Sequence, residues 1–273
     1  MTNFIEAYCA QIRLAGAGSV IAKPVVVARD STYAMHYVPC EYLNPQAALV
    51  LVSTTPGHAH VRLAAAVTEE LLHTHAPGRV VQRENKRRVE LGGKLVRPNL
   101  IRMLDHFRVP ELVGLPHAAA LWNDGFERLQ PLALLPHATT RRGLAFDGPL
   151  EELLDAPMLR DVFETQFLGA VRQMRTDALY IALGRTAWAA LQHAVTRRLL
   201  ARRQLLGMMP VPARAGSMVR YFLREIAASA LSAKDPVRHR VDWLDAAHAE
   251  LESNVRKLRA SVRPEPPPAY LIA

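Results

Sequence analysis

Hydroxyl and imidazole side chains gather in one short loop, residues 53–60, with the sequence Ser-Thr-Thr-Pro-Gly-His-Ala-His. The Thr-Pro-Gly turn keeps Thr55 close along the chain to His58 and His60. A threonine hydroxyl can hold a water molecule, although it cannot act as a general base at neutral pH. A histidine can donate a hydrogen bond, stack on a base or orient a water. These residue types suit hydrolysis, although Thr55 could instead cap the following helix and each histidine could simply meet solvent or phosphate.

Four short apolar runs, separated by helical patterns, predict the elements that position this loop. Such nearly continuous runs are typical of strands buried on both faces of a parallel sheet, and they span residues 47–53, 129–135, 177–184 and 203–209. Apolar residues at three- and four-residue spacing predict helices over residues 60–75, 99–107, 156–174, 186–203, 217–233 and 241–262. The sequence therefore predicts an α/β fold with a helix-covered parallel sheet.

The loops that follow the strands should carry the function, because ligands of such sheets bind outside the carboxyl ends of the strands. These loops are residues 53–60, 136–142, 184–186 and 209–217. In the first and the last loop, a proline-containing turn leads into a helix. The free backbone N–H groups at the start of such a helix can bind a phosphate or a developing anion.

This pair of loops resembles the uracil-DNA glycosylase superfamily. There the first strand ends in a Gly-x-Asn-Pro-Gly or similar loop that positions the attacking water. The last strand ends in a His-Pro-Ser-Pro or His-Pro-Ser-Gly loop that enters the minor groove. The corresponding stretches here are residues 53–57, Ser-Thr-Thr-Pro-Gly, and 209–213, Met-Pro-Val-Pro-Ala. Residues 37–57, 96–109 and 179–191 also look like segments of bacterial members with a Gly-Ile-Thr-Pro-Gly first loop, so the resemblance extends from about Tyr37 to Leu223.

The resemblance implies a single three-layer α/β/α domain over residues 1–262, with a central, mostly parallel four-stranded sheet, and a proline-rich tail at 263–273. It implies a monofunctional DNA glycosylase that uses water, without metal or cofactor, to release a flipped-out pyrimidine and leave an abasic site. Thr55 stands where many members have Asn or Asp, and Met209 takes the place of the catalytic histidine. Because both side chains differ, we expect a modified pyrimidine in place of plain uracil. One example is a hypermodified cytosine in phage DNA, cleaved in an antiviral defence role.

The resemblance and the residue types together suggest catalytic and base-binding candidates. Thr55, His60 and Asp124 are the catalytic candidates. Asp124 is the nearest carboxylate ahead of the second strand, although its Asn-Asp-Gly context also predicts a turn. His58 and His137 are candidates for the base pocket, since His137 stands near the position from which the superfamily reads the base edge.

Three residues of the last loop are candidates for contact with DNA. Met209 could wedge between base steps, and Arg214 could enter the minor groove. Ser217 could contact a phosphate or cap the helix that follows.

The charge of the chain favours a polyanionic partner. Its formal net charge is +9, with dense basic runs at residues 78–102 and 196–203. Each basic side chain laid against a phosphate releases condensed counterions, so DNA is the expected partner. Either run alone could instead be a solvated helix face.

Other compositional features predict a cytoplasmic monomer without a membrane partner. Cys9 and Cys40 are too few for a disulfide framework or a cysteine-ligated metal site, so both are expected as reduced thiols. No apolar run reaches the roughly 18 residues of a membrane span, and the first residues lack the pattern of a signal peptide.

Three alternatives remain open at this point. The protein could be a uracil-DNA repair glycosylase, or a catalytically weak DNA-binding module of the same fold. Thr55 and Met209 favour the DNA-binding module, because they leave no obvious strong acid or base. A hydrolase of free nucleosides or nucleotides is the third, but it would leave the basic runs without a partner.

Overall fold

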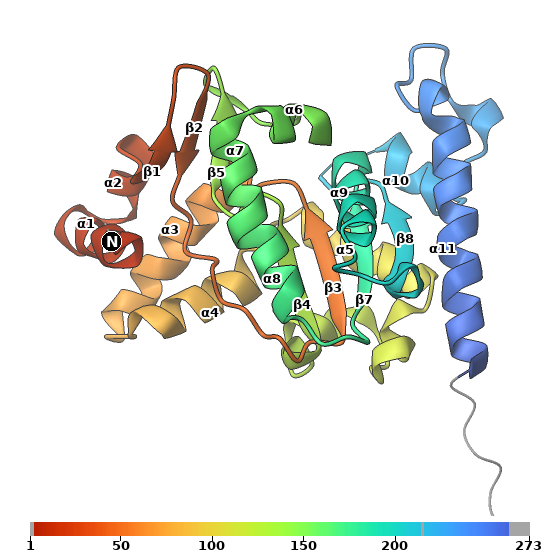
Figure 1. Ribbon diagram of the computed structural model, residues 1–273, viewed down its shortest axis with the longest axis horizontal. Helices are drawn as coiled ribbons and strands as arrows, with labels where there is room; N and C mark the ends of the chain where they lie inside the picture. The colour runs from red at the N-terminus through yellow and green to blue at the C-terminus, as the bar shows by residue number, and fades with distance from the viewer. Residues whose placement is uncertain (1–2, 214–215, 262–273) are drawn as a thin grey trace, which may run out of the picture.

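Four parallel strands form the sheet that positions the predicted loops (Figure 1). The structure is a computed structural model and describes residues 3–213 and 216–261. The strands are β3 (Leu49–Ser53), β4 (Leu129–Ala133), β7 (Leu179–Leu183) and β8 (Leu205–Met209), in the order β4-β3-β7-β8. Almost every residue of these strands is buried, which explains their continuous apolar runs. The predicted α/β fold and its parallel four-stranded sheet are confirmed.

A second sheet, which the sequence analysis did not predict, is antiparallel. It contains β1 (Val26–Arg29), β2 (Tyr33–His36), β5 (Ala138–Arg141) and β6 (Leu144–Ala145), in the order β1-β2-β5-β6. These strands are only two to four residues long, and several of their side chains are exposed. They therefore lack the apolar run that reveals a buried strand.

Helices precede, connect and follow the strands. They are α1 (Phe4–Ala15), α2 (Ala17–Ala22), α3 (His58–His73), α4 (Gly78–Arg88), α5 (Val96–His106), α6 (Leu150–Asp155), α7 (Pro157–Val162), α8 (Leu168–Gln173), α9 (Arg185–Thr196), α10 (Ser217–Phe222) and α11 (Val241–Ser261). One π-helical turn, Phe163–Phe167, joins α7 to α8. The loops after β3, β7 and β8 lead into α3, α9 and α10, as the predicted order requires.

Two predicted helices end earlier than their apolar patterns suggest. The helix expected over 186–203 ends at Thr196, and the one expected over 217–233 ends at Phe222. Shortly after each end stands an arginine with positive φ, 58° at Arg198 and 61° at Arg224. A residue in the left-handed conformation cannot continue a right-handed helix, so the chain turns away.

The C-terminal helix closes one side of the parallel sheet. Figure 1 shows α11 alongside β8, and Leu244, Ala247 and Leu251 of this helix are buried in the core. The start of α11 lies at the edge of the parallel sheet where β8 ends (Figure 1).

Some compositional expectations concern parts of the chain that the structure describes. Within 3–213 and 216–261, no helix combines the length and the apolarity needed to cross a membrane. Cys9 and Cys40 are both buried and form no disulfide. The tail at 263–273 lies outside the described residues.

Candidate functional site

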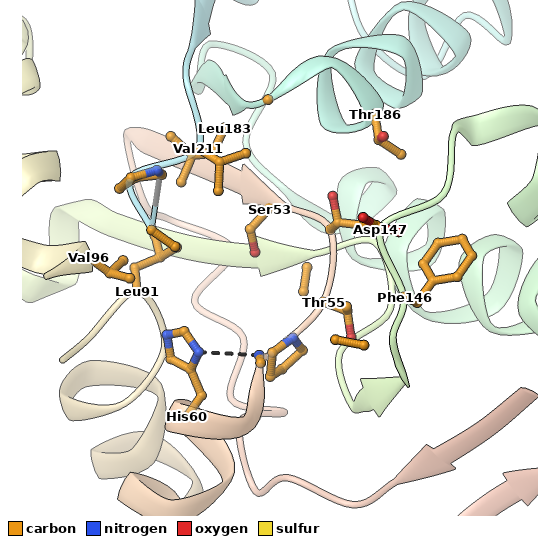
Figure 2. A pocket seen from close by; sticks show the side chains of 18 of the residues that line it. Ser53, Thr55, His60, Leu91, Val96, Phe146, Asp147, Leu183, Thr186 and Val211 are labelled. Atoms are coloured by element: carbon orange, nitrogen blue, oxygen red, sulfur yellow. Dashed lines mark hydrogen bonds between the residues drawn. The ribbon is translucent and has the colours of Figure 1, made fainter. Parts of the chain in front are cut away.

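A cavity of about 610 Å³ opens at the carboxyl edge of the parallel sheet. Its walls contain residues from the end of all four strands: Ser53 to Gly57 after β3, Ala133 of β4, Leu183 to Thr186 after β7, and Val211 to Ala213 after β8. The sequence placed the site at this edge, and the cavity lies there. Figure 2 shows His60, Leu91 and Val96 on one side of the cavity and Phe146, Asp147 and Thr186 on the other.

Thr55 lines the cavity, but its hydroxyl already makes two hydrogen bonds. Its Oγ1 donates to the carbonyl of His137 at 2.8 Å and accepts from the backbone N–H of Thr139 at 3.2 Å. The first loop is thereby fixed to the chain that joins the two sheets. A hydroxyl has one donor and two acceptor positions, so Thr55 keeps one acceptor position with which to hold a water.

His60 lines the cavity, and one of its ring nitrogens is buried. It is the third residue of α3, where its Nδ1 accepts a hydrogen bond at 3.3 Å from the backbone N–H of Gly57 (Figure 2). Because Nδ1 acts as an acceptor, the neutral ring carries its proton on Nε2. That Nε2 is buried and has no hydrogen-bond partner among residues 3–213 and 216–261. Burial lowers the pKa of His60, and the charge of Arg97 lowers it further, so the ring is neutral at pH 7.

Aromatic side chains contribute two further parts of the wall. Phe146 follows β6 and is buried, and Trp243 lies in the first turn of α11 and is half-buried. Rings of this kind can stack on a planar heterocycle. The remaining wall is largely apolar, with Leu91, Val96 and Leu183 among its members.

Two arginines line the cavity without a counter-ion. Arg185 is the first residue of α9, and Arg240 directly precedes α11. In the described ranges neither side chain forms an ion pair or a hydrogen bond. The free N–H groups of the first turn of α9 lie beside Arg185, and both features attract an anion.

Two carboxylates line the cavity in different environments. Asp147 is exposed, and its nearest cation is Arg141, with 3.8 Å between carboxylate oxygen and guanidinium nitrogen. Glu90 is buried and pairs at 2.5 Å with Lys86, which also donates to the carbonyl of Pro131 at 3.2 Å. Burial raises the pKa of Glu90. Because Glu90 is buried and paired, Asp147 is the carboxylate that can meet a water.

The two base-pocket candidates lie outside the cavity wall. His137 is 2% exposed, its Nδ1 accepts from the backbone N–H of Val38 at 3.3 Å, and burial lowers its pKa to about 4. It supports the loop of Thr55 through its carbonyl and does not present its ring to the cavity. His58 is exposed at the start of α3 and faces solvent.

Asp124 lies far from the cavity along the sheet. It occupies an exposed turn ahead of β4, which is the amino end of that strand, whereas the cavity lies at the carboxyl end. The turn predicted from Asn-Asp-Gly is therefore its place in the fold, and a catalytic role in this cavity is excluded by position.

The candidates for DNA contact in the last loop also need correction. Met209 is completely buried at the end of β8, because this strand packs within the core, so its side chain cannot wedge between bases. The hydroxyl of Ser217 donates to the carboxylate of Asp235 at 2.9 Å, and the helix cap is Gly216. Arg214 lies outside the described residues.

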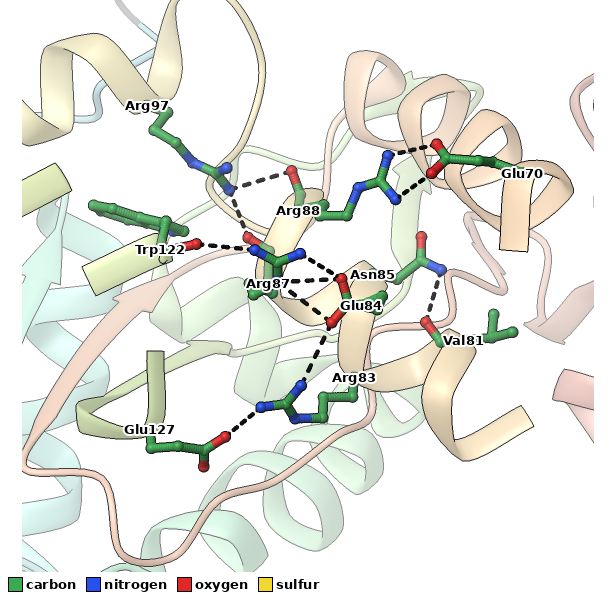
Figure 3. A network of polar contacts seen from close by, with 10 residues as sticks. All are labelled: Glu70, Val81, Arg83, Glu84, Asn85, Arg87, Arg88, Arg97, Trp122 and Glu127. Atoms are coloured by element: carbon green, nitrogen blue, oxygen red, sulfur yellow. Dashed lines mark hydrogen bonds and ion pairs between the residues drawn. The ribbon is translucent and has the colours of Figure 1, made fainter. Parts of the chain in front are cut away.

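The larger basic run is mostly neutralised within the protein. Three of its four arginines on α4 lie against carboxylates of α3, α4 and the turn before β4, so much of the charge of this run is balanced within the protein. The pairs are Arg83 with Glu127, Arg87 with Glu84 and Arg88 with Glu70 (Figure 3). Arg97 is half-buried, donates to backbone carbonyls at the end of α4, and lies over the ring of Trp122, with 5.1 Å between its guanidinium carbon and the ring centroid.

Several residues of the wall were not among the candidates from the sequence, and they include Phe146, Asp147, Arg240 and Trp243. Phe146 and Asp147 follow a two-residue strand that has no apolar pattern, and Trp243 has the spacing of an ordinary helical core residue. Arg185 does fall within the loop 184–186 that was expected to carry function. Within the described residues, no group of three or more His, Cys, Asp or Glu side chains could hold a metal ion.

Comparisons with known proteins identify a distant relative. No family profile matches the chain, and no solved structure matches it. The chain is 22% identical over 197 residues to the uncharacterized protein YoxB of Bacillus subtilis (strain 168), a match that covers 72% of this chain and 77% of YoxB. The name of YoxB states no activity.

Proposed function

We propose that the protein is a monofunctional DNA glycosylase that hydrolyses the N-glycosidic bond of a flipped-out pyrimidine and leaves an abasic site. The observation that supports this most is His60, which lines a largely apolar cavity at the carboxyl edge of the sheet and whose buried Nε2–H has no partner among the residues that the structure describes. A departing base develops negative charge, and a donor already in place stabilises it without reorganisation.

The other half of the reaction concerns the sugar. Its transition state resembles an oxocarbenium ion, which needs nearby negative charge and a positioned water. Asp147 supplies a carboxylate on the side of the cavity opposite His60 (Figure 2). The free acceptor position of Thr55 can hold the attacking water, while Asp147 takes its proton and stabilises the cationic sugar.

Binding of the nucleotide would use the rest of the wall. Arg185 and Arg240 would contact the phosphates that flank the target, and Phe146 or Trp243 would stack on the extruded base. The cavity of about 610 Å³ lies in the range of sites for drug-sized ligands. This size supports a pyrimidine with a bulky substituent, such as a hypermodified cytosine in phage DNA, over plain uracil.

The proposal includes membership of the uracil-DNA glycosylase superfamily and its three-layer α/β/α arrangement. The parallel order β4-β3-β7-β8 supports it, because β3 and β8, the first and last strands of this sheet along the chain, end in the two loops on which the resemblance is based. The proposal also includes a cytoplasmic location, as expected from the sequence.

Excision assays would test the function. Purified protein would be incubated with uracil-containing DNA and with phage DNA that carries modified cytosines, followed by detection of alkali-labile abasic sites and released base. We expect release from the modified DNA, and a loss of about 100-fold in His60→Ala, since one removed donor costs that much in comparable sites. His58→Ala is the matched control, because His58 belongs to the same helix turn but is exposed outside the cavity.

A DNA-binding module without catalysis is the second candidate. It is favoured by the hydroxyl of Thr55, whose proton is donated to the His137 carbonyl. Retained DNA binding without any abasic product on either substrate would select this reading over the glycosylase.

A further inference from the structure

The hairpin of β5 and β6 presents an apolar side chain beside the cavity. Arg141 pairs with Leu144, so Arg142 and Gly143 form a two-residue turn. Both turn residues have positive φ, 49° and 82°, which is the turn geometry that matches the twist of the strands. Leu144 follows the turn and exposes 76% of its surface.

A lone exposed leucine is ordinary on a protein surface, but the position of Leu144 is not. The three residues that follow it, Ala145, Phe146 and Asp147, all line the cavity. Two residues of extended chain span at most about 7 Å. Leu144 therefore lies within about two base-pair steps of the cavity wall at Phe146, since one step is about 3.4 Å.

The base of this hairpin is fixed on both sides. The backbone N–H of Arg142 donates to the carbonyl of Thr32 at 2.7 Å, beside the β1–β2 turn. Glu152 of α6 pairs with Arg141 at 2.7 Å and accepts from the hydroxyl of Tyr33 at 2.8 Å. A tip held in this way can be pressed against another molecule without folding back.

The turn keeps a positive charge next to Leu144 at a conformational cost. Asn or Gly is preferred at the position of Arg142, because other side chains are strained at a positive φ. Arg142 is exposed, and its side chain forms no ion pair within the described ranges. A cation beside an exposed apolar tip is complementary to the phosphates and stacked bases of DNA.

We infer that this hairpin is the wedge that enters double-stranded DNA when the target nucleotide leaves the stack. Leu144 fills the vacated space while Arg142 contacts a flanking phosphate, and this inference rests on the proposed glycosylase function. Extrusion costs a few kcal/mol, which an inserted apolar side chain offsets. The wedge thus belongs to the second sheet, and the buried Met209 of the last strand has no part in it.

The test compares Leu144→Ala with the wild type on duplex and single-stranded forms of the same modified oligonucleotide. Excision from the duplex should fall about tenfold or more, because about 1.4 kcal/mol of lost wedging corresponds to a factor of ten. Excision from the single strand should stay unchanged, since no stack has to be opened. Leu14→Ala is the control, because Leu14 on α1 is 88% exposed and lies outside the cavity wall.

A second measurement separates this inference from the glycosylase function. A duplex with 2-aminopurine next to the target reports base unstacking by fluorescence even when nothing is excised. Wild type and Leu14→Ala should raise the fluorescence on binding, and Leu144→Ala should not. An equal rise with Leu144→Ala, or an unchanged ratio of duplex to single-strand excision, would overturn the wedge. So would the finding that Leu144→Ala only dissociates a dimer, since the tip would then be a contact between copies.

Discussion

His60 is the residue on which the proposed chemistry most depends, because its two ring nitrogens have separate tasks. Nδ1 is occupied by the N–H of Gly57, and Nε2 is left as a buried donor beside the cavity. The sequence indicated that a histidine near a Thr-Pro-Gly turn could act on a substrate. The sequence could not distinguish His60 from His58, because it does not fix where α3 begins. The helix begins at His58, so His60 is its third residue and turns back towards the capping residue Gly57.

Acid should abolish the proposed excision through His60. Protonation of the ring requires a proton on Nδ1, which would break the bond from Gly57, and burial lowers the pKa of His60 below its usual value. Excision by the wild type should therefore be constant near neutral pH and fall as pH drops through this lowered pKa. His60→Gln, which does not titrate, should be slower and should lose this acidic limb in a pH–rate profile. A limb that persists in His60→Gln would assign the titration to another group.

Three of the four parallel strands, β3, β7 and β8, contribute to the site through the turn that follows them. The turn after β7 depends on Gly184, which caps α9 with a φ of 96° and lies against Val211 of the loop after β8. Two loops distant in sequence are thereby packed together at the cavity wall. A side chain at this position would separate them.

Gly184→Ala should damage both the fold and the site. An added Cβ would lie 2.6 Å from Cγ2 of Val211, in a conformation that side chains rarely adopt. We expect a loss of about 1 to 3 kcal/mol in the free energy of unfolding, measured by urea denaturation, together with weaker excision. Gly169→Ala is the matched control, since Gly169 lies within α8 with open space around it and should gain up to about 1 kcal/mol. Equal stability of the two variants would refute the close packing.

The elements that the sequence revealed are those whose burial leaves a periodic mark. The four parallel strands are buried throughout, so their apolar runs located them to within about two residues at each end. The hairpin of β5 and β6 escaped notice because Leu144 and Ala145 are both exposed. Asp147 and Phe146 were missed for the same reason, since the position of each depends on pairing between distant strands.

At the scale of the whole molecule, His137 links the two sheets and couples folding to pH. Its carbonyl holds Thr55, its Nδ1 accepts from Val38, and its ring contacts Tyr37 with 5.1 Å between centroids. Burial lowers its pKa to about 4, whereas an unfolded histidine titrates near 6.5. Between these values the unfolded chain binds a proton that the folded protein does not.

The protein should therefore lose stability as pH falls from about 6.5 to 4. The shift corresponds to about 3 kcal/mol from this one group, fully present above pH 6.5. His137→Asn keeps an acceptor for Val38 but cannot titrate in this range. It should be less stable at pH 7.5 and lose less stability on acidification, as measured by urea denaturation at several pH values. His239→Asn, at an exposed position, should follow the wild type. A slope in His137→Asn as steep as in the wild type would contradict the assignment.

Net charge alone does not locate the DNA contact, because ion pairs neutralise much of the basic surface. Arg88 and Arg197 pair with Glu70 and Glu164, whereas Arg185 and Arg240 line the cavity without a partner in the described residues. The affinity for DNA should fall with salt in proportion to the number of phosphates contacted, with a slope of about 0.9 per contact on duplex. Loss of both cavity arginines should therefore lower the slope of log Kd against log salt by about 2. Loss of both paired arginines should leave it unchanged.

The comparison would use Arg185→Ala/Arg240→Ala beside Arg88→Ala/Arg197→Ala, so that both double variants lose the same formal charge. Fluorescence anisotropy with a labelled duplex at several salt concentrations would give the slopes. A general effect of net charge would weaken binding equally in both variants, since long-range attraction depends on total charge. A selective loss of slope in the first variant would place the phosphate contacts at the cavity, where the proposed reaction needs them. An equal loss in both would mean that the +9 charge attracts DNA without a defined site.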